Sequence, residues 1–468
     1  MFRSLIIPLA FVACFSNAYA TLKPVSLFSD HMVLQKGVVV PVWGTAGEGA
    51  LVTVQYNGQS VSAKTVQGKW MLSLQPLPYI SKGSEMKIFS GPDTIHIQDV
   101  LVGEVWLCSG QSNMERQLGP RPPQQPIYNW EQERDAANYP LIREYYVPLK
   151  YSTTTIPDVN NQWTVCSPQT VSDFTAVGYF FAKNLYAKMQ VPVGIIFSAF
   201  GGTPAEDWTS IAALESNPNL KDMIQNYAKT ISGPGWKPQG QCISGLYNGM
   251  IYPLLPYAIK GVAWYQGESN NDRAAEYQEI LPTMIANWRT DFKQPEMPFL
   301  IVQIAPHKGM RPEIREAQFL VVKKVKKTAL IVTTDCGDSA DIHPTHKQPV
   351  GERLAIAAAG LAYGVKGEYS GPMFQQSTQE KDQLIVTFSH TGKGLVAKGD
   401  TLTGFEISNG QEYYPAIARI QKNKIVLFNE HVPHPTLVRY GWTNVPKVNL
   451  YNKEGLPASP FRNDVSNN

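Results

Sequence analysis

The sequence has few cysteines and few charged residues for its length, and each shortage excludes a class of protein. Five cysteines in 468 residues do not make a disulfide scaffold, and no C-x-x-C spacing indicates a metal site. Charged residues are only 17% of the chain and the net charge is +3, so a nucleic-acid-binding surface is not expected. After the first twenty residues, no apolar run reaches the ~20 residues that a membrane helix needs.

The N-terminus has the three parts of a secretory signal peptide. Arg3 supplies a positive charge, residues 5–15 form an apolar stretch, and Ala18-Tyr19-Ala20 is an A-x-A cleavage site. The sequence therefore predicts cleavage near Ala20 and export of the chain to the periplasm or the extracellular space.

Four cysteines remain after this cleavage: Cys108, Cys166, Cys242 and Cys336. Cys108 and Cys336 lie in or just after apolar strands, where a cysteine usually acts as a small buried hydrophobic residue. The sequence leaves open whether Cys166 and Cys242 pair.

The pattern of apolar residues divides the chain into three regions. Residues 21–102 and 367–468 contain short alternating runs broken by turn signals, as in β-sandwich-like regions. Residues 103–366 alternate apolar strands with amphipathic helical segments, which predicts an α/β domain with a three-layer core. The five strands expected in its parallel sheet are residues 105–109, 193–199, 261–265, 299–304 and 329–333.

The residues that could carry chemistry gather at the ends of these strands. Ser112 follows the first strand, Gly201-Gly202 the second and Gln266-Gly267-Glu268 the third, while Asp341 and His343 lie in the loop after the fifth. Because ligands of doubly wound sheets bind at the carboxyl ends of the strands, we expect these residues to meet at one edge. A serine, oxyanion donors and a histidine together indicate acyl transfer.

Ser112 has two interpretations. Ser112 and Glu115 form a capping box, in which the two side chains satisfy N–H groups at a helix start. The serine can also be a nucleophile, and then it needs a base, because an alcohol is largely protonated at neutral pH. His343 is the candidate base, with His346 as its neighbour and competitor.

The histidine needs a group that orients it. Asp341 is the candidate acceptor for Nδ1 of His343, although it could equally be an Asx-turn residue in the loop. Asp335 and Asp338 lie in the same loop and are further possibilities.

An oxyanion needs donors that already point at it. We expect these to be the backbone N–H groups of Ser112 and Gly202 and the side-chain amide of Gln266. Glu268 is a candidate second base or substrate contact, but a structural hydrogen bond to Asn113 or to the Ser112 loop is favoured.

Five separated motifs resemble the sialate O-acetylesterase group of the SGNH hydrolases. They are GQSNM (110–114), FGGTPAEDW (200–208), WYQGESN (264–270), REAQ (315–318) and DIHPTHKQPVGERLA (341–355). The resemblance extends from about residue 21 to residue 466. It implies a serine esterase that removes acetyl groups from sugars without a metal or other cofactor, with Ser112 as nucleophile, His343 as base, and Gly202 and Gln266 in the oxyanion hole.

The chain departs from the general SGNH pattern at two positions. Ala340 occupies the position three residues before the histidine where the pattern has aspartate, and Asp341 lies only two residues before it. A Ser–His dyad oriented by a backbone carbonyl is therefore an alternative to a triad. The usual asparagine of the oxyanion hole is represented by Gln266.

The sequence thus predicts an exported carbohydrate O-acetylesterase that acts on 9-O-acetylated sialic acid or a related acetylated sugar. Arg116 and Arg315 are candidates for pairing with the sialate carboxylate. An acetyl xylan or other polysaccharide acetylesterase is the alternative within the same chemistry. A non-catalytic glycan-binding protein is the alternative from a different class.

Overall fold

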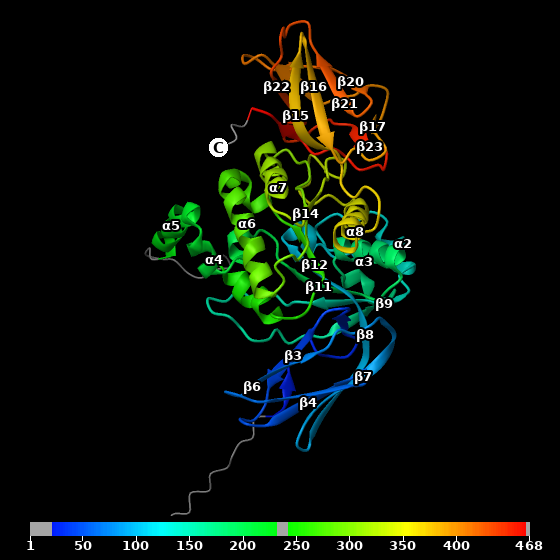
Figure 1. Ribbon diagram of the computed structural model, residues 1–468, viewed down its shortest axis with the longest axis vertical. Coiled ribbons are helices and arrows are strands. Elements are labelled where there is room, and N and C mark those ends of the chain that lie inside the picture. The colour runs from blue at the N-terminus through cyan, green and yellow to red at the C-terminus, as the bar shows by residue number, and fades with distance from the viewer. Residues whose placement is uncertain (1–20, 232–241, 465–468) are drawn as a thin grey trace, which may run out of the picture.

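The computed structural model describes residues 21–231 and 242–464. The predicted signal peptide, residues 1–20, lies outside the described residues. An N-terminal β region, a central α/β region and a C-terminal β region follow one another along the longest axis of the molecule (Figure 1).

The N-terminal region is built from strands that pair mostly antiparallel, with one parallel pair. Its hairpin between β4 and β5 turns at Asn57 and Gly58, whose φ angles of 48° and 76° fit the type I′ turn expected from that residue pair. The last strand, β8, continues from this region into the central sheet, so the boundary expected at residue 102 falls inside one strand. The strands are β1 Lys23–Pro24, β2 Val33–Gln35, β3 Val40–Thr45, β4 Leu51–Tyr56, β5 Gln59–Lys64, β6 Lys69–Leu74, β7 Ile80–Ser90 and β8 Asp93–Gly110.

The central sheet contains all five predicted strands and two that were not predicted. Within the described residues its order is β10-β9-β11-β8-β12-β13-β14, and all neighbours from β9 to β14 run parallel. The count of five was wrong because β9 carries Arg143 and Glu144 in mid-strand and so shows no continuous apolar run. The remaining strands are β9 Tyr139–Tyr146, β10 Trp163–Cys166, β11 Val193–Ala199, β12 Gly261–Tyr265, β13 Phe299–Val302 and β14 Thr328–Ile331.

Helices cover both faces of this sheet. Trp106 and Cys108 of β8 pack with α3 and α8 in one hydrophobic cluster, while Val105 and Leu107 belong to a second cluster with α6 and α7. Alternate residues of a strand point to opposite faces, so the two helix pairs lie on opposite sides of the sheet (Figure 1). The helices are α1 Ser112–Glu115, α2 Trp130–Asp135, α3 Ala176–Met189, α4 Ile211–Ser216, α5 Lys221–Ile231, α6 Ala274–Asp291, α7 Pro312–Lys324 and α8 Gln348–Tyr363.

The C-terminal β region has its own apolar core, in which Phe405, Tyr440 and Phe461 pack together. It contacts the central region through an ion pair between Arg462 and Glu316 of α7, with nitrogen and oxygen 3.0 Å apart. Its strands are β15 Met373–Glu380, β16 Gln383–Ser389, β17 Leu395–Ala397, β18 Phe405–Ser408, β19 Tyr414–Pro415, β20 Ile417–Gln421, β21 Lys424–Phe428, β22 Leu437–Tyr440, β23 Leu450–Asn452 and β24 Phe461–Arg462.

Two further findings concern the cysteines and the membrane. Cys108, Cys166, Cys242 and Cys336 are all free thiols, so none of these four forms a disulfide with another. In the part of the chain that the structure describes, no helix combines the length and the apolar character needed to cross a membrane.

Candidate active site

Ser112 is held at the end of β8 by close contact between β8 and β12. A Cβ atom on Gly110 would lie 2.1 Å from the carbonyl oxygen of Tyr265, and Gly110 has φ of 139°, so this position requires glycine. The backbone N–H of Gln111 donates to the same carbonyl at 3.0 Å, and the Gln111 side chain accepts from the Ser269 N–H at 3.2 Å. Ser112 then begins helix α1.

His343 lies in contact with Ser112. Its Nε2 is 2.9 Å from Oγ of Ser112, although the two residues are 231 positions apart in the sequence. The competing His346 stacks instead on Tyr128, with ring centroids 4.6 Å apart. The structure therefore brings together the predicted nucleophile and the predicted base.

The charge environment of His343 favours its neutral form. Burial lowers the pKa of His343 below 6.5, and the positive charges of Lys347 and Arg116 lower it further, while Asp341 opposes them. A neutral imidazole can accept a proton at neutral pH. This is the protonation state that a general base requires.

Asp341 contacts the backbone of His343 more closely than its ring. Its Oδ1 accepts the His343 N–H at 2.8 Å but lies 3.7 Å from Nδ1, which is too long for a hydrogen bond. The other two candidates have different partners. Asp335 pairs with Arg353 at 2.6 Å, and Asp338 accepts the N–H of Ala340 at 2.8 Å.

The glycine loop after β11 lies directly against Ser112. A Cβ atom added to Gly201 would be 3.1 Å from Cβ of Ser112. The Gly201 N–H donates to Oε2 of Glu115 at 2.7 Å, and Gly202 has φ of 74°. The capping-box interpretation was wrong, because Gln111 is the N-cap of α1 and Glu115 holds the glycine loop instead.

Gln266 is buried beside this loop, but its amide hydrogens already have acceptors. Nε2 donates to the Thr203 carbonyl at 3.1 Å and to Oδ1 of Asn270 at 2.8 Å. The side-chain amide of Asn270 is fixed in this orientation, because its Nδ2 donates to Glu206 and its Oδ1 also accepts from the Ala205 N–H. In this arrangement Gln266 supports the glycine loop, and it can reach an oxyanion only by giving up one of these bonds.

A buried polar cluster connects the serine, the third strand end and the histidine loop. Asn113 donates to Oε1 of Glu268 at 2.7 Å and to the Ile342 carbonyl at 3.0 Å. Nζ of Lys347 donates to Oδ1 of Asn113 at 2.5 Å. The structural hydrogen bond expected of Glu268 is therefore present, and Glu268 is 8% exposed.

Lys347 was missed by the sequence analysis. It is 1% exposed, and burial together with the charge of Arg116 lowers its pKa from 10.5 to about 7. A lysine just before a helix is usually solvated, so nothing in the sequence pattern distinguishes this one.

The sequence predicts that Arg116 or Arg315 pairs with a substrate carboxylate. Both are fully buried, so neither can receive one. The guanidinium of Arg116 donates to the carbonyl of Gln125, and that of Arg315 donates to the carbonyl of Thr443. Both therefore tie chain segments together. Sequence reasoning placed them near the substrate because it identified charge but not burial.

The arrangement as a whole is suited to acyl transfer. A serine hydroxyl contacts a neutral imidazole, and backbone of a glycine loop lies beside the serine. Among residues 21–231 and 242–464, no group of three or more His, Cys, Asp or Glu side chains is placed to hold a metal ion.

Comparison with known proteins gives consistent matches. The family model described as "Carbohydrate esterase, sialic acid-specific acetylesterase" matches residues 102–359. A sialate O-acetylesterase from Rattus norvegicus is 30% identical over 93% of both chains, and one from Homo sapiens is 29% identical over 93% of this chain and 91% of that protein. The crystal structure of a carbohydrate acetylesterase from Xanthomonas citri superposes with a TM-score of 0.85 at 34% identity, covering 95% of this chain and 99% of the other.

Proposed function

Because the chain is an ester hydrolase that belongs to the sialic acid-specific carbohydrate acetylesterase family, we propose that it removes the acetyl group from 9-O-acetylated sialic acid through a Ser112–His343 mechanism. The observation that carries the mechanism is the 2.9 Å contact between Oγ of Ser112 and Nε2 of His343. We further propose that residues 1–20 direct export and are then removed.

The first half of the reaction forms an acetyl-enzyme. Oγ of Ser112 attacks the acetyl carbonyl carbon while its proton passes to Nε2 of His343. The tetrahedral intermediate then collapses, the C–O bond to the sugar breaks, and His343 returns the proton to the departing sugar oxygen. The products of this half are the free sugar hydroxyl and acetyl-Ser112.

The second half uses water in place of the sugar. Nε2 of His343 takes a proton from a water molecule that attacks the acetyl-Ser112 carbonyl. Collapse of this second intermediate breaks the bond to Oγ and returns the proton to Ser112. Acetate leaves, and the enzyme is restored.

The negative oxygen of both intermediates requires donors beside Ser112. Ser112 is the first residue of α1, where helix N–H groups have no acceptor within the helix. Gly202 follows Gly201, which lies against Ser112, and the positive φ of Gly202 turns the chain at this point. We assign the oxyanion hole to the backbone N–H groups of Ser112 and Gly202, each of which would contribute about 3 kcal/mol. Gln266 supports the glycine loop through its hydrogen bond to the Thr203 carbonyl.

Asp341 has a smaller part in this mechanism than in a full triad. It fixes the backbone of His343 through a hydrogen bond and acts on the ring at 3.7 Å through its charge. The reaction is therefore closer to that of a dyad, with Asp341 as a positioning residue.

The test is the release of acetate from defined substrates. Purified protein is incubated with 9-O-acetylated and 4-O-acetylated sialic acid and with acetylated xylan, and a Ser112→Ala variant is treated in parallel. We expect fastest turnover of the 9-O-acetylated sugar and none by Ser112→Ala. Turnover of acetylated xylan alone would contradict the proposed substrate. Unchanged turnover by Ser112→Ala would contradict the proposed mechanism. Glycan binding without any hydrolysis by the native protein would favour a non-catalytic role.

A further inference from the structure

We propose that a cavity beside Ser112 binds the sugar of the substrate, and that Arg121 at its edge pairs with a carboxylate on that sugar. This inference rests on the proposed function, and it deepens it by naming the group that would select an acidic sugar.

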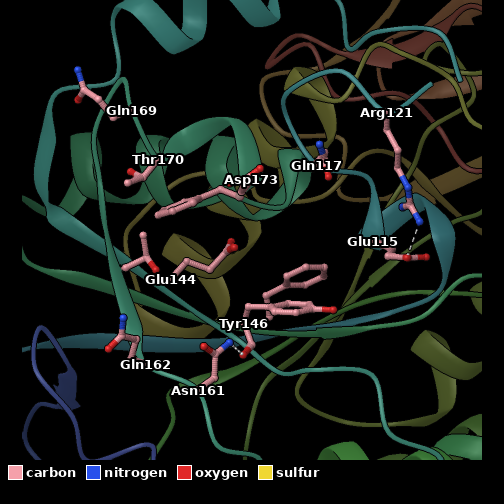
Figure 2. A pocket seen from close by; sticks show the side chains of 13 residues that line it. Glu115, Gln117, Arg121, Glu144, Tyr146, Asn161, Gln162, Gln169, Thr170 and Asp173 are labelled. Atoms are coloured by element: carbon pink, nitrogen blue, oxygen red, sulfur yellow. Dashed lines mark hydrogen bonds and ion pairs between the residues drawn. The ribbon is translucent and has the colours of Figure 1, made fainter. Parts of the chain in front are cut away.

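The cavity has a volume of about 460 Å³, within the range of roughly 300–1,000 Å³ typical of small-molecule sites. Its walls come from the end of α1 and the loop after it, from β9, β10 and β11, and from the segment before α3. Figure 2 shows Arg121 and Glu115 together at one side of it, with Asn161 and Gln162 at another.

Two residues of the cavity lining, Glu115 and Arg121, connect it to the catalytic pair. Glu115, which lines it, lies one helical turn after Ser112, and side chains three apart on a helix are neighbours. Glu115 also holds Gly201, the residue that contacts Ser112. The charge of Arg121 reaches His343 as well, because it contributes to lowering the pKa of that ring.

The lining suits a sugar ring with several hydroxyl groups. Asn161, Gln162 and Gln169 offer side-chain amides, which both donate and accept hydrogen bonds. Tyr146 is 44% exposed and its ring packs on Phe197, with centroids 5.5 Å apart, so the cavity also has an apolar surface.

Glu144 adds a buried carboxyl group to this lining. The residue is 4% exposed, and its Oε2 accepts the Thr175 N–H at 3.2 Å. Burial raises the pKa of Glu144 well above its usual value, which favours the neutral form of the carboxyl group and so reduces its repulsion of an anionic ligand.

Arg121 is the arginine that a ligand in this cavity can reach. Its side chain is 40% exposed, whereas Arg116 and Arg315 are completely buried. Its Nη2 donates to Oε1 of Glu115 at 2.8 Å, and the guanidinium carries four further N–H donors. Both oxygens of Glu115 already accept hydrogen bonds, from Arg121 and from the Gly201 N–H. An arriving carboxylate can thus pair with Arg121 while Glu115 keeps the loop in place.

The experiment compares two substrates that differ only in charge. These are 9-O-acetyl-N-acetylneuraminic acid and its C1 carboxamide, and acetate release gives kcat and KM for each. We expect the native enzyme to prefer the acid. Arg121→Gln should reduce that preference about tenfold to a hundredfold, mainly through KM, because a charge-assisted hydrogen bond is lost. Arg121→Lys should keep part of the preference.

Two further variants separate charge recognition from occupation of the cavity. Arg134→Gln is the matched control, since Arg134 is also partly exposed and paired with a carboxylate but does not line the cavity. It should keep the native preference. Gln162→Trp fills the cavity from an exposed position, and it should raise KM for the acid and the carboxamide alike.

The outcomes distinguish this inference from the proposed function. An unchanged preference in Arg121→Gln, or an unchanged KM in Gln162→Trp, overturns the inference while hydrolysis of the acetylated sugar stands. If the native enzyme releases no acetate from either sugar, the proposed function itself is wrong.

Discussion

Replacing Asp341 with asparagine tests how the histidine is oriented, and the structure gives the size of the effect. The variant keeps an oxygen that can accept the His343 N–H but removes the negative charge 3.7 Å from Nδ1. Two unit charges at this separation attract by about 1 kcal/mol in water and by about 4 kcal/mol at an effective dielectric of 20. The Asp341 side chain is 36% exposed, so solvent screening favours the lower end, about 1–2 kcal/mol.

We therefore expect Asp341→Asn to lower kcat by about 10-fold. A carboxylate that controls the histidine tautomer through a direct hydrogen bond typically contributes about 10⁴-fold. Steady-state acetate release by the variant measures the difference. A loss near 10⁴-fold would refute the reasoning, because it would show that Asp341 reaches Nδ1 during the reaction. Asp338→Asn is the control, since Asp338 lies in the same loop and accepts hydrogen bonds from the backbone N–H groups of Ala340 and Asp341.

The same variant has a predicted pH signature. The charge of Asp341 raises the pKa of His343, so its removal lowers that pKa. His343 then stays neutral at lower pH. The acid limb of the kcat/KM profile should therefore move to lower pH. A shift to higher pH would contradict the assigned electrostatics.

The remaining predictions concern other parts of the site and the fold. Lys347→Met should move the acid limb to higher pH, opposite to Asp341→Asn, because the lysine charge lowers the pKa of His343; a pH profile of kcat/KM checks this. Gly110→Ala should destabilise the fold by several kcal/mol, because its Cβ would lie 2.1 Å from a carbonyl oxygen at a φ of 139°, and urea unfolding measures the change. Reducing agent should leave the melting temperature unchanged, because the four cysteines outside the predicted signal peptide are free thiols; a lower Tm under reduction would contradict that.

The main features of the fold could be predicted because buried parallel strands have a strong sequence signal. The five continuous apolar runs all fall in central strands, and their ends identified the edge where Ser112 meets His343. Strand β9 was missed because Arg143 and Glu144 interrupt its apolar pattern. Both are nearly buried, and only contacts from distant segments, such as Asp99 with Arg143, make this possible.

The supporting residues of the site could not be predicted for a similar reason. Sequence patterns identify a residue that can be charged, but not whether it is buried. Arg116 and Arg315 are therefore predicted to contact substrate, although both are fully buried, and no pattern distinguishes the buried Lys347 from a surface lysine. The partners that bury these groups come from segments far away in the sequence, as with Thr443 for Arg315.

The central claim is that Ser112 is the nucleophile activated by His343, and active-site labelling tests it most directly. The native protein is treated with a fluorophosphonate, and the modified peptide is identified by mass spectrometry while residual acetate release is measured. The account predicts one label on Ser112, activity lost in proportion to labelling, and greatly slowed labelling in His343→Ala. Labelling of another residue with complete loss of activity, or full activity in a protein labelled at Ser112, would contradict it.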